Sequence, residues 1–146
     1  MGVNLYNSEG YVDPTAHEAL TNIIEEEKKQ KRKIVFICSP FAGDVAGNID
    51  RARRYGRFAV TKNTIPVIPH LMYPQFLCED DPAERQLGIE MGLALLASCQ
   101  ELWVFGGRVT SGMAVEIEKA KAIGIPIKYF TVDCKPVGGL EYGSTS

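Results

Sequence analysis

Lys33-Ile-Val-Phe-Ile-Cys38 and Glu101-Leu-Trp-Val-Phe105 are the two stretches that decide the predicted fold of this 146-residue chain. Nearly every residue in them is apolar, without the alternation of a half-exposed strand. Such runs are typical of parallel strands that are covered on both faces. Two more runs of strand length, residues 65–68 and 125–130, follow the same pattern, and segments with helical spacing separate the four. The sequence therefore predicts an α/β fold with a short parallel sheet.

Proline positions predict the order of the strands. Proline cannot donate a hydrogen bond to a neighbouring strand, so it is confined to edge strands or strand starts. Pro66 and Pro126 mark the second and fourth runs as edges. The first and third runs then lie in the centre, and the order is 2-1-3-4. We expect a Rossmann-like or flavodoxin-like three-layer sandwich with a ligand crevice at the carboxyl ends of strands one and three.

Helix signals fit between these strands. Asp81-Pro82 provides a capping acid followed by proline at the first helical position, which predicts a helix from there to about Ser98. Four residues at helical spacing, three of them small (Ile49, Ala52, Gly56 and Ala59), predict a helix that lies close to the sheet between the first two strands. A third helix is expected to begin near Ser111, which would be its N-cap.

The length predicts one core rather than two. We expect an α/β domain over residues 33–130, an N-terminal helical extension over residues 1–32 and a C-terminal tail over residues 131–146. Asp13-Pro14-Thr15 would begin the helix of the extension. The tail is rich in glycine and serine and is expected to be partly disordered.

Composition argues against nucleic-acid-binding, membrane, secreted and metal-binding classes of protein. The net charge of −2 gives no general attraction to nucleic acid, and the basic face of the first helix is expected to be solvated, with phosphate or nucleic-acid binding as the alternative. No apolar stretch is long enough to cross a bilayer and no secretory signal is seen, so a cytoplasmic protein without membrane contact is expected. The four cysteines form no C-x-x-C pair and the two histidines are isolated. Neither a metal nor a cofactor is predicted.

Two loops fall at the predicted crevice, one after each central strand. Their glycines permit a close approach to a ligand, and a helix start offers free N–H groups. Tight turns without a ligand are the alternative interpretation. Candidate ligand-binding residues from these loops and from the end of the second strand are Ser39, Phe41, Gly43, His70, Gly107, Arg108, Ser111, Gly112 and Met113. Phe41, Tyr73 and Phe76 are candidates for stacking on an aromatic ligand.

Glu116 is the acid best placed for chemistry. It lies one turn into the helix that opens over the crevice, on the side of Met113 and Ala120, which should pack on the sheet. Glu118 shares its side of the helix with Lys121 and is expected to be solvated. The alternative for Glu116 is an i,i+3 ion pair with Lys119.

Three motifs carry a resemblance to a known family. They are Ile37-Cys38-Ser39-Pro40, Ile68-Pro69-His70, and Ser111-Gly112-Met113-Ala114-Val115-Glu116 with Ala120 and Gly124-Ile125-Pro126 behind it. Over residues 33–130 the chain resembles the nucleoside 2-deoxyribosyltransferase-like superfamily, in a small-domain branch found in bacterial and phage-related genomes. The resemblance implies a nucleoside or nucleotide ligand, Glu116 as nucleophile and self-association into a homo-oligomer.

The implied reaction is cleavage of an N-glycosidic bond. The carboxylate would attack the anomeric carbon, and the glycosyl-enzyme intermediate would pass to water or to another base. Glu90 or Asp44 would supply the proton. The sequence departs from the superfamily where assisting aspartates are usual, because Thr110 and Gly92 occupy those positions.

Two other functions stay open. A non-catalytic module of the same fold that binds or senses a nucleotide is favoured by the missing aspartates. A phosphoribohydrolase of the cytokinin-activating type is a third reading, because Gly106-Gly107 followed by Thr110 is similar to its glycine-rich turn.

Overall fold

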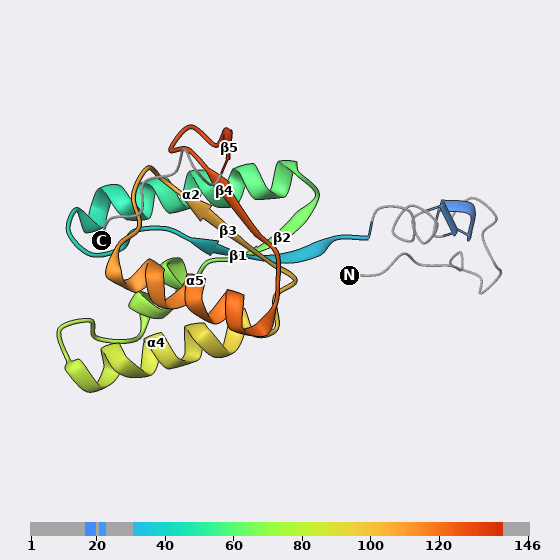
Figure 1. Ribbon diagram of the computed structural model, residues 1–146. Helices are drawn as coiled ribbons and strands as arrows, with labels where there is room; N and C mark the ends of the chain where they lie inside the picture. The colour runs from blue at the N-terminus through green and yellow to red at the C-terminus, as the bar shows by residue number, and fades with distance from the viewer. Residues whose placement is uncertain (1–16, 20, 23–30, 139–146) are drawn as a thin grey trace, which may run out of the picture. The chain divides into compact units, whose positions relative to one another are not determined.

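Residues 17–19, 21–22 and 31–138 are described by the computed structural model (Figure 1). The chain divides into two compact units, residues 1–32 and 33–146. In the first unit, residues 17–19 and 21–22 are helical, and the Thr21 hydroxyl donates to the His17 carbonyl oxygen at 2.9 Å. The predicted helix start at residues 13–15 lies outside the described residues.

The second unit contains a five-stranded sheet in the order β2-β1-β3-β4-β5. Its strands are β1 (Lys33–Cys38), β2 (Thr64–Val67), β3 (Glu101–Phe105), β4 (Ile127–Phe130) and β5 (Pro136–Val137). The first four are parallel, and β5 is antiparallel to β4. The predicted α/β class, the parallel sheet and the order of the first four strands are confirmed.

One edge of the sheet differs from the prediction. β4 is not an edge strand, because β5 pairs with it and Pro136 lies opposite Phe130. Pro126 precedes β4 and leaves the pairing of that strand intact. The turn before β5 is closed by the Thr131 amide, which donates to the Lys135 carbonyl oxygen at 2.8 Å. Residues 131–138 are therefore ordered chain in this structure, and residues 139–146 lie outside the described part.

The central strands are buried on both faces, as their continuous apolar character predicts. All five residues of β3 are buried. Leu102 and Val104 contribute to the core on one face, and Trp103 and Phe105 contribute to the core on the other. Alternation along the strand thus builds two apolar layers from one short segment.

Helices cover these two layers (Figure 1). α2 (Val45–Thr61) lies on one face and packs Tyr55 and Ala59 into the core there. α4 (Pro82–Leu96) and α5 (Ser111–Ile123) lie on the other face. The short helix α3 (Pro69–Met72) and a 3-10 turn (Tyr73–Gln75) connect β2 to α4. The result is the predicted three-layer sandwich.

Side-chain caps begin both α4 and α5. The cap of α4 is the predicted residue, whereas the cap of α5 lies one residue before the predicted one. Asp81 caps α4 by accepting from the Ala83 amide at 2.9 Å, as predicted, and that helix ends at Leu96. α5 is capped by Thr110, whose hydroxyl accepts from the Met113 amide at 3.3 Å. Ser111 is the first helical residue instead, because Thr110 has the extended backbone that an N-cap requires.

In the described part of the chain, no helix has the length and apolar character needed to cross a membrane.

Candidate functional site

A cavity of about 400 Å³ lies beside the carboxyl ends of β1 and β3. Its walls come from the loop after β1, from α3 and the turn behind it, and from α4 and α5. Eight residues that the sequence singles out line it: Ser39, Phe41, Gly43, His70, Ser111, Gly112, Met113 and Glu116. The two loops that the strand order predicts to meet do meet there.

Glu116 turns its carboxyl group into this cavity. The residue as a whole is half-buried, but its Oε1 atom is inaccessible to solvent and has no hydrogen-bond partner among the described residues. Burial raises the pKa of the Glu116 carboxyl to about 7, and the neighbouring Cys38 thiol opposes part of that rise in pKa. The ion pair with Lys119 is not formed, whereas Glu118 pairs with Lys121 at 3.6 Å.

Ser39, like Glu116, has a buried side-chain oxygen without a hydrogen-bond partner among the described residues. It is 1% exposed, and its hydroxyl is buried without a hydrogen-bond partner in the described chain. Ser39 Oγ and Glu116 Oε1 are the two buried side-chain oxygen or nitrogen atoms of the described residues in this state, and both belong to residues that line one cavity. Buried polar atoms are nearly always satisfied, so a ligand with hydrogen-bonding groups is the natural partner for this pair.

Cys38 is a buried neighbour of Glu116. Its thiol donates to the Met113 carbonyl oxygen at 3.8 Å. Burial, and then the Glu116 charge, raise the pKa of the Cys38 thiol well above its usual value. The thiol therefore stays protonated and acts as a structural group rather than a nucleophile.

His70 and Phe41 form an aromatic wall of the cavity. Their ring centroids are 4.9 Å apart at an angle of 45°. Burial lowers the pKa of His70 to about 4, so the imidazole is uncharged at neutral pH. A neutral ring of this kind can contact a planar base and offer it one donor or one acceptor. Tyr73, a predicted stacking candidate, also lines the cavity, but Phe76 does not.

Sequence reasoning missed the wall that α4 contributes. Arg85, Gly88, Ile89 and Gly92 line the cavity and follow one another at helical spacing, so they share one face of α4. Two glycines inside a helix cost stability relative to alanine. Their recurrence on one face was a signal available in the sequence that this face leaves room for a ligand. Thr110 and Glu79 complete the missed polar lining.

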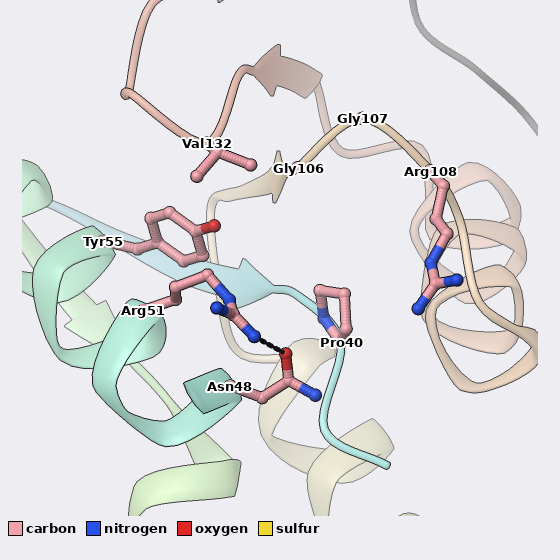
Figure 2. A pocket seen from close by; sticks show the side chains of 8 residues that line it. All are labelled: Pro40, Asn48, Arg51, Tyr55, Gly106, Gly107, Arg108 and Val132. Atoms are coloured by element: carbon pink, nitrogen blue, oxygen red, sulfur yellow. Dashed lines mark hydrogen bonds between the residues drawn. The ribbon is translucent and has the colours of Figure 1, made fainter. Parts of the chain in front are cut away.

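Four predicted site residues lie elsewhere. Gly107 and Arg108 line a second cavity, shown in Figure 2. Asp44 is the N-cap of α2: it accepts from the Gly47 amide at 3.2 Å and pairs with Arg51 at 3.4 Å. Glu90 is exposed on α4 and is not part of either lining.

No group of three or more potential metal ligands occurs among residues 17–19, 21–22 and 31–138.

Comparison with known proteins adds a family and a fold. Residues 33–130 match the model of a family described as a domain of unknown function (DUF7768). No curated protein matches the chain. Among solved structures, the chain is similar to a 2-deoxyribosyltransferase from the psychrotolerant bacterium Bacillus psychrosaccharolyticus, with 12% identity, a TM-score of 0.56 and coverage of 67% of this chain and 72% of that chain.

A second similar structure is a 2-desoxiribosyltransferase from Leishmania mexicana. It has 17% identity and a TM-score of 0.48, with coverage of 68% of this chain and 64% of that chain. At these identities, the likeness to the Bacillus enzyme establishes a shared fold.

Proposed function

Since this chain belongs to the family described as a domain of unknown function (DUF7768), we propose its function from the cavity itself: cleavage or transfer at the N-glycosidic bond of a nucleoside or nucleotide. Glu116 would be the nucleophile. The shared fold of the Bacillus 2-deoxyribosyltransferase is consistent with this class of reaction.

One observation carries the proposal. The two buried oxygen atoms without a partner in the described chain, Ser39 Oγ and Glu116 Oε1, belong to residues of the same cavity. A carboxylate oxygen without a hydrogen-bond donor is available to form a bond to an electrophilic carbon. A serine hydroxyl in the same cavity can bind a sugar hydroxyl or an oxygen at the 5′ end of the sugar.

The reaction needs few other groups. A Glu116 oxygen forms a bond to the anomeric carbon while the bond from that carbon to the base nitrogen breaks, and the base leaves with the electron pair and takes up a proton. Attack by water then gives the free sugar, whereas attack by a second base gives a new nucleoside. Phe41 and the neutral His70 ring would hold the base. Glu79 is the other carboxylate of the cavity lining and replaces Asp44 and Glu90 as the candidate proton donor.

The test is base release by the full chain. We would incubate the protein with common ribonucleosides and 2′-deoxynucleosides and their 5′-monophosphates, with and without a second free base, and separate the products by chromatography. The Glu116→Gln variant should lose base release by about 10²-fold or more, because the amide is a poor nucleophile. Glu118→Gln is the matched control, since Glu118 lies on the same helix but outside the cavity.

Equal release by the Glu116→Gln variant and the unaltered chain would exclude the nucleophile role. A new nucleoside formed with the added base would identify a transferase, and free sugar would identify a hydrolase.

A binding module without catalysis is the second candidate function, and two positions favour it. Thr110, where the superfamily usually has an assisting aspartate, is used as the helix cap. Gly92 occupies the position where another is usual, and a Cβ added there would make ordinary contact with Pro69 at 3.9 Å. A nucleotide that binds tightly and is recovered unchanged after long incubation would favour this candidate.

A further inference from the structure

The second cavity differs in chemistry from the first. It has a volume of about 280 Å³, and its lining is Pro40, Asn48, Arg51, Tyr55, Gly106, Gly107, Arg108 and Val132. Two of these eight residues are arginines and none is acidic. Figure 2 shows Arg51 and Arg108 on opposite sides of Pro40. A cavity with this charge favours an anion.

Arg51 is held in place from one side. Its Nη2 atom donates to Asn48 Oδ1 at 2.8 Å and lies 3.4 Å from Asp44 Oδ2. Asn48 is 7% exposed and is itself fixed, because its amide nitrogen donates to the carbonyl oxygens of Phe41 and Ala42 at 2.9 and 3.1 Å. Both contacts of Arg51 use one nitrogen, so the rest of the guanidinium group remains for a ligand.

Arg108 is exposed and forms no ion pair with any residue that the structure describes. It extends from the loop after β3, next to Gly106 and Gly107. An added Cβ on Gly107 would meet no atom within 4 Å. Packing therefore does not explain the glycine, whereas close approach of a ligand to the backbone would.

Tyr55 supplies a hydroxyl group to the lining of the second cavity. The residue is 1% exposed, and its ring stacks on Phe105 with the centroids 4.3 Å apart. Its hydroxyl points into the cavity that the residue lines (Figure 2). Burial, ahead of the neighbouring charges, raises the pKa of the Tyr55 hydroxyl, so the group stays protonated and can donate to an anion.

The two cavities are neighbours. Ser39 lines the first and Pro40 the second, while Arg108 lines the second and Thr110 the first. Consecutive Cα atoms are about 3.8 Å apart, so the two linings adjoin at these two loops. A sugar that contacts Ser39 could therefore extend its 5′ substituent past Pro40.

We propose that the second cavity binds a phosphate group on the 5′ side of the ligand, so that the chain takes nucleoside 5′-phosphates in preference to nucleosides. This inference rests on the proposed function for the first cavity. Arg51, Arg108 and the Tyr55 hydroxyl bind the phosphate oxygens, and the open backbone at Gly107 lets the phosphate approach. Asn48 is a positioning residue, because it holds Arg51 and the loop after β1 together.

The experiment measures binding separately from turnover. The full-length Glu116→Gln variant would be titrated calorimetrically with matched pairs of nucleosides and their 5′-monophosphates. We expect the monophosphate of at least one pair to bind about tenfold or more tightly than its nucleoside, since charge-assisted hydrogen bonds are the stronger class. Adding Arg108→Gln, Arg51→Gln or Tyr55→Phe should reduce monophosphate affinity and leave nucleoside affinity unchanged.

Arg53→Gln is the matched control, because Arg53 is an exposed arginine of α2 outside the cavity lining. Arg108 is on an exposed loop, so its variant tests the cavity even if the Arg51 variant disturbs Asn48. Equal affinity within every pair would overturn the inference, as would an equal loss of nucleoside and monophosphate affinity in the Arg108 variant. Failure of every compound to bind would overturn it together with the proposed function.

Base release by the unaltered chain separates the two proposals. Release at equal rates from nucleosides and monophosphates, with equal affinities, would retain the proposed function and exclude the phosphate site. A monophosphate preference that depends on Arg108, without any base release, would retain the phosphate site and exclude catalysis.

Discussion

The Glu116 carboxyl group determines how the proposed reaction should depend on pH. Burial raises its pKa to about 7, and only the ionised form is a nucleophile. We predict that kcat/KM for base release rises with pH, about tenfold per pH unit below 7, and levels off above that value. Rates measured from pH 5 to 9 test this, with Glu118→Gln expected to show the same profile. A rate that falls as pH rises through 7 would mean that the protonated carboxyl acts as an acid instead.

The Glu116 carboxyl group should also make the free energy of unfolding depend on pH. Its pKa is higher in the folded than in the unfolded chain, so between about pH 4.5 and 7 the folded state holds the proton more firmly. This group's contribution to stability is therefore greatest at low pH, falls as pH rises towards 7 and stays low above it. Glu116→Gln, which carries no charge, should be more stable than the unaltered chain at pH 8 by about 1 to 3 kcal/mol.

Denaturant unfolding at pH 4.5 and pH 8 checks this difference. The gain should disappear at pH 4.5, where the Glu116 carboxyl is protonated in the folded chain. Glu118→Gln, at an exposed position, should show no comparable change between the two pH values. A gain of the same size at both pH values would mean that burial of the charge is not the cause.

At the scale of the element, the start of α5 is the feature to test. Thr110 caps this helix, and Ser111 follows it as the first helical residue. Thr110→Ala should lower the free energy of unfolding by about 1 kcal/mol, since an unsatisfied helix amide results. Ser111→Ala should change it by less than about 0.5 kcal/mol. The reverse ranking in denaturant unfolding would show that Ser111 is the cap after all.

The helix ends also show what local sequence can and cannot specify. Asp81-Pro82 is an unambiguous start and is found as predicted. Thr110 and Ser111 are both good caps in adjacent positions, so sequence alone does not choose between them. The extended backbone of Thr110 and the buried position of Met113 distinguish the two in the structure.

At the scale of the whole molecule, the division into two units leads us to expect that the chain tolerates removal of the first unit. The described apolar core begins at Val35, within the unit of residues 33–146. Removing residues 1–32 should therefore change the free energy of unfolding by less than about 1 kcal/mol. Ending the chain at residue 130 as well should cost more, because β5 and the packing of Cys134 against the core are lost. Denaturant unfolding of the two fragments beside the full chain tests the difference.

Self-association is a separate prediction for the whole molecule. The resemblance to the deoxyribosyltransferase-like superfamily implies a dimer or larger assembly, and residues 1–32 are surplus to the sheet unit. Light scattering at micromolar concentration should show an oligomer for the full chain and a smaller species for residues 33–146. A monomeric full chain would contradict the prediction.

The class of fold and the order of the first four strands could be predicted from the sequence. Continuous apolar strands, helical spacing and the placement of Pro66 depend on local periodicity and backbone chemistry, which are written in neighbouring residues. Glu116, with Ser39 and His70, could be proposed because parallel strands bring their carboxyl ends to one edge.

Only the tertiary structure decided how the candidate residues divide. It placed Arg108 and Gly107 in one cavity and Glu116 in another, assigned Asp44 to a helix cap, and added Arg85 and the glycine face of α4. These outcomes depend on which side of a loop each side chain faces and on contacts between segments far apart in the chain. Burial of the Glu116 carboxyl, which raises its pKa, likewise arises from the packing of β1, α4 and α5 together.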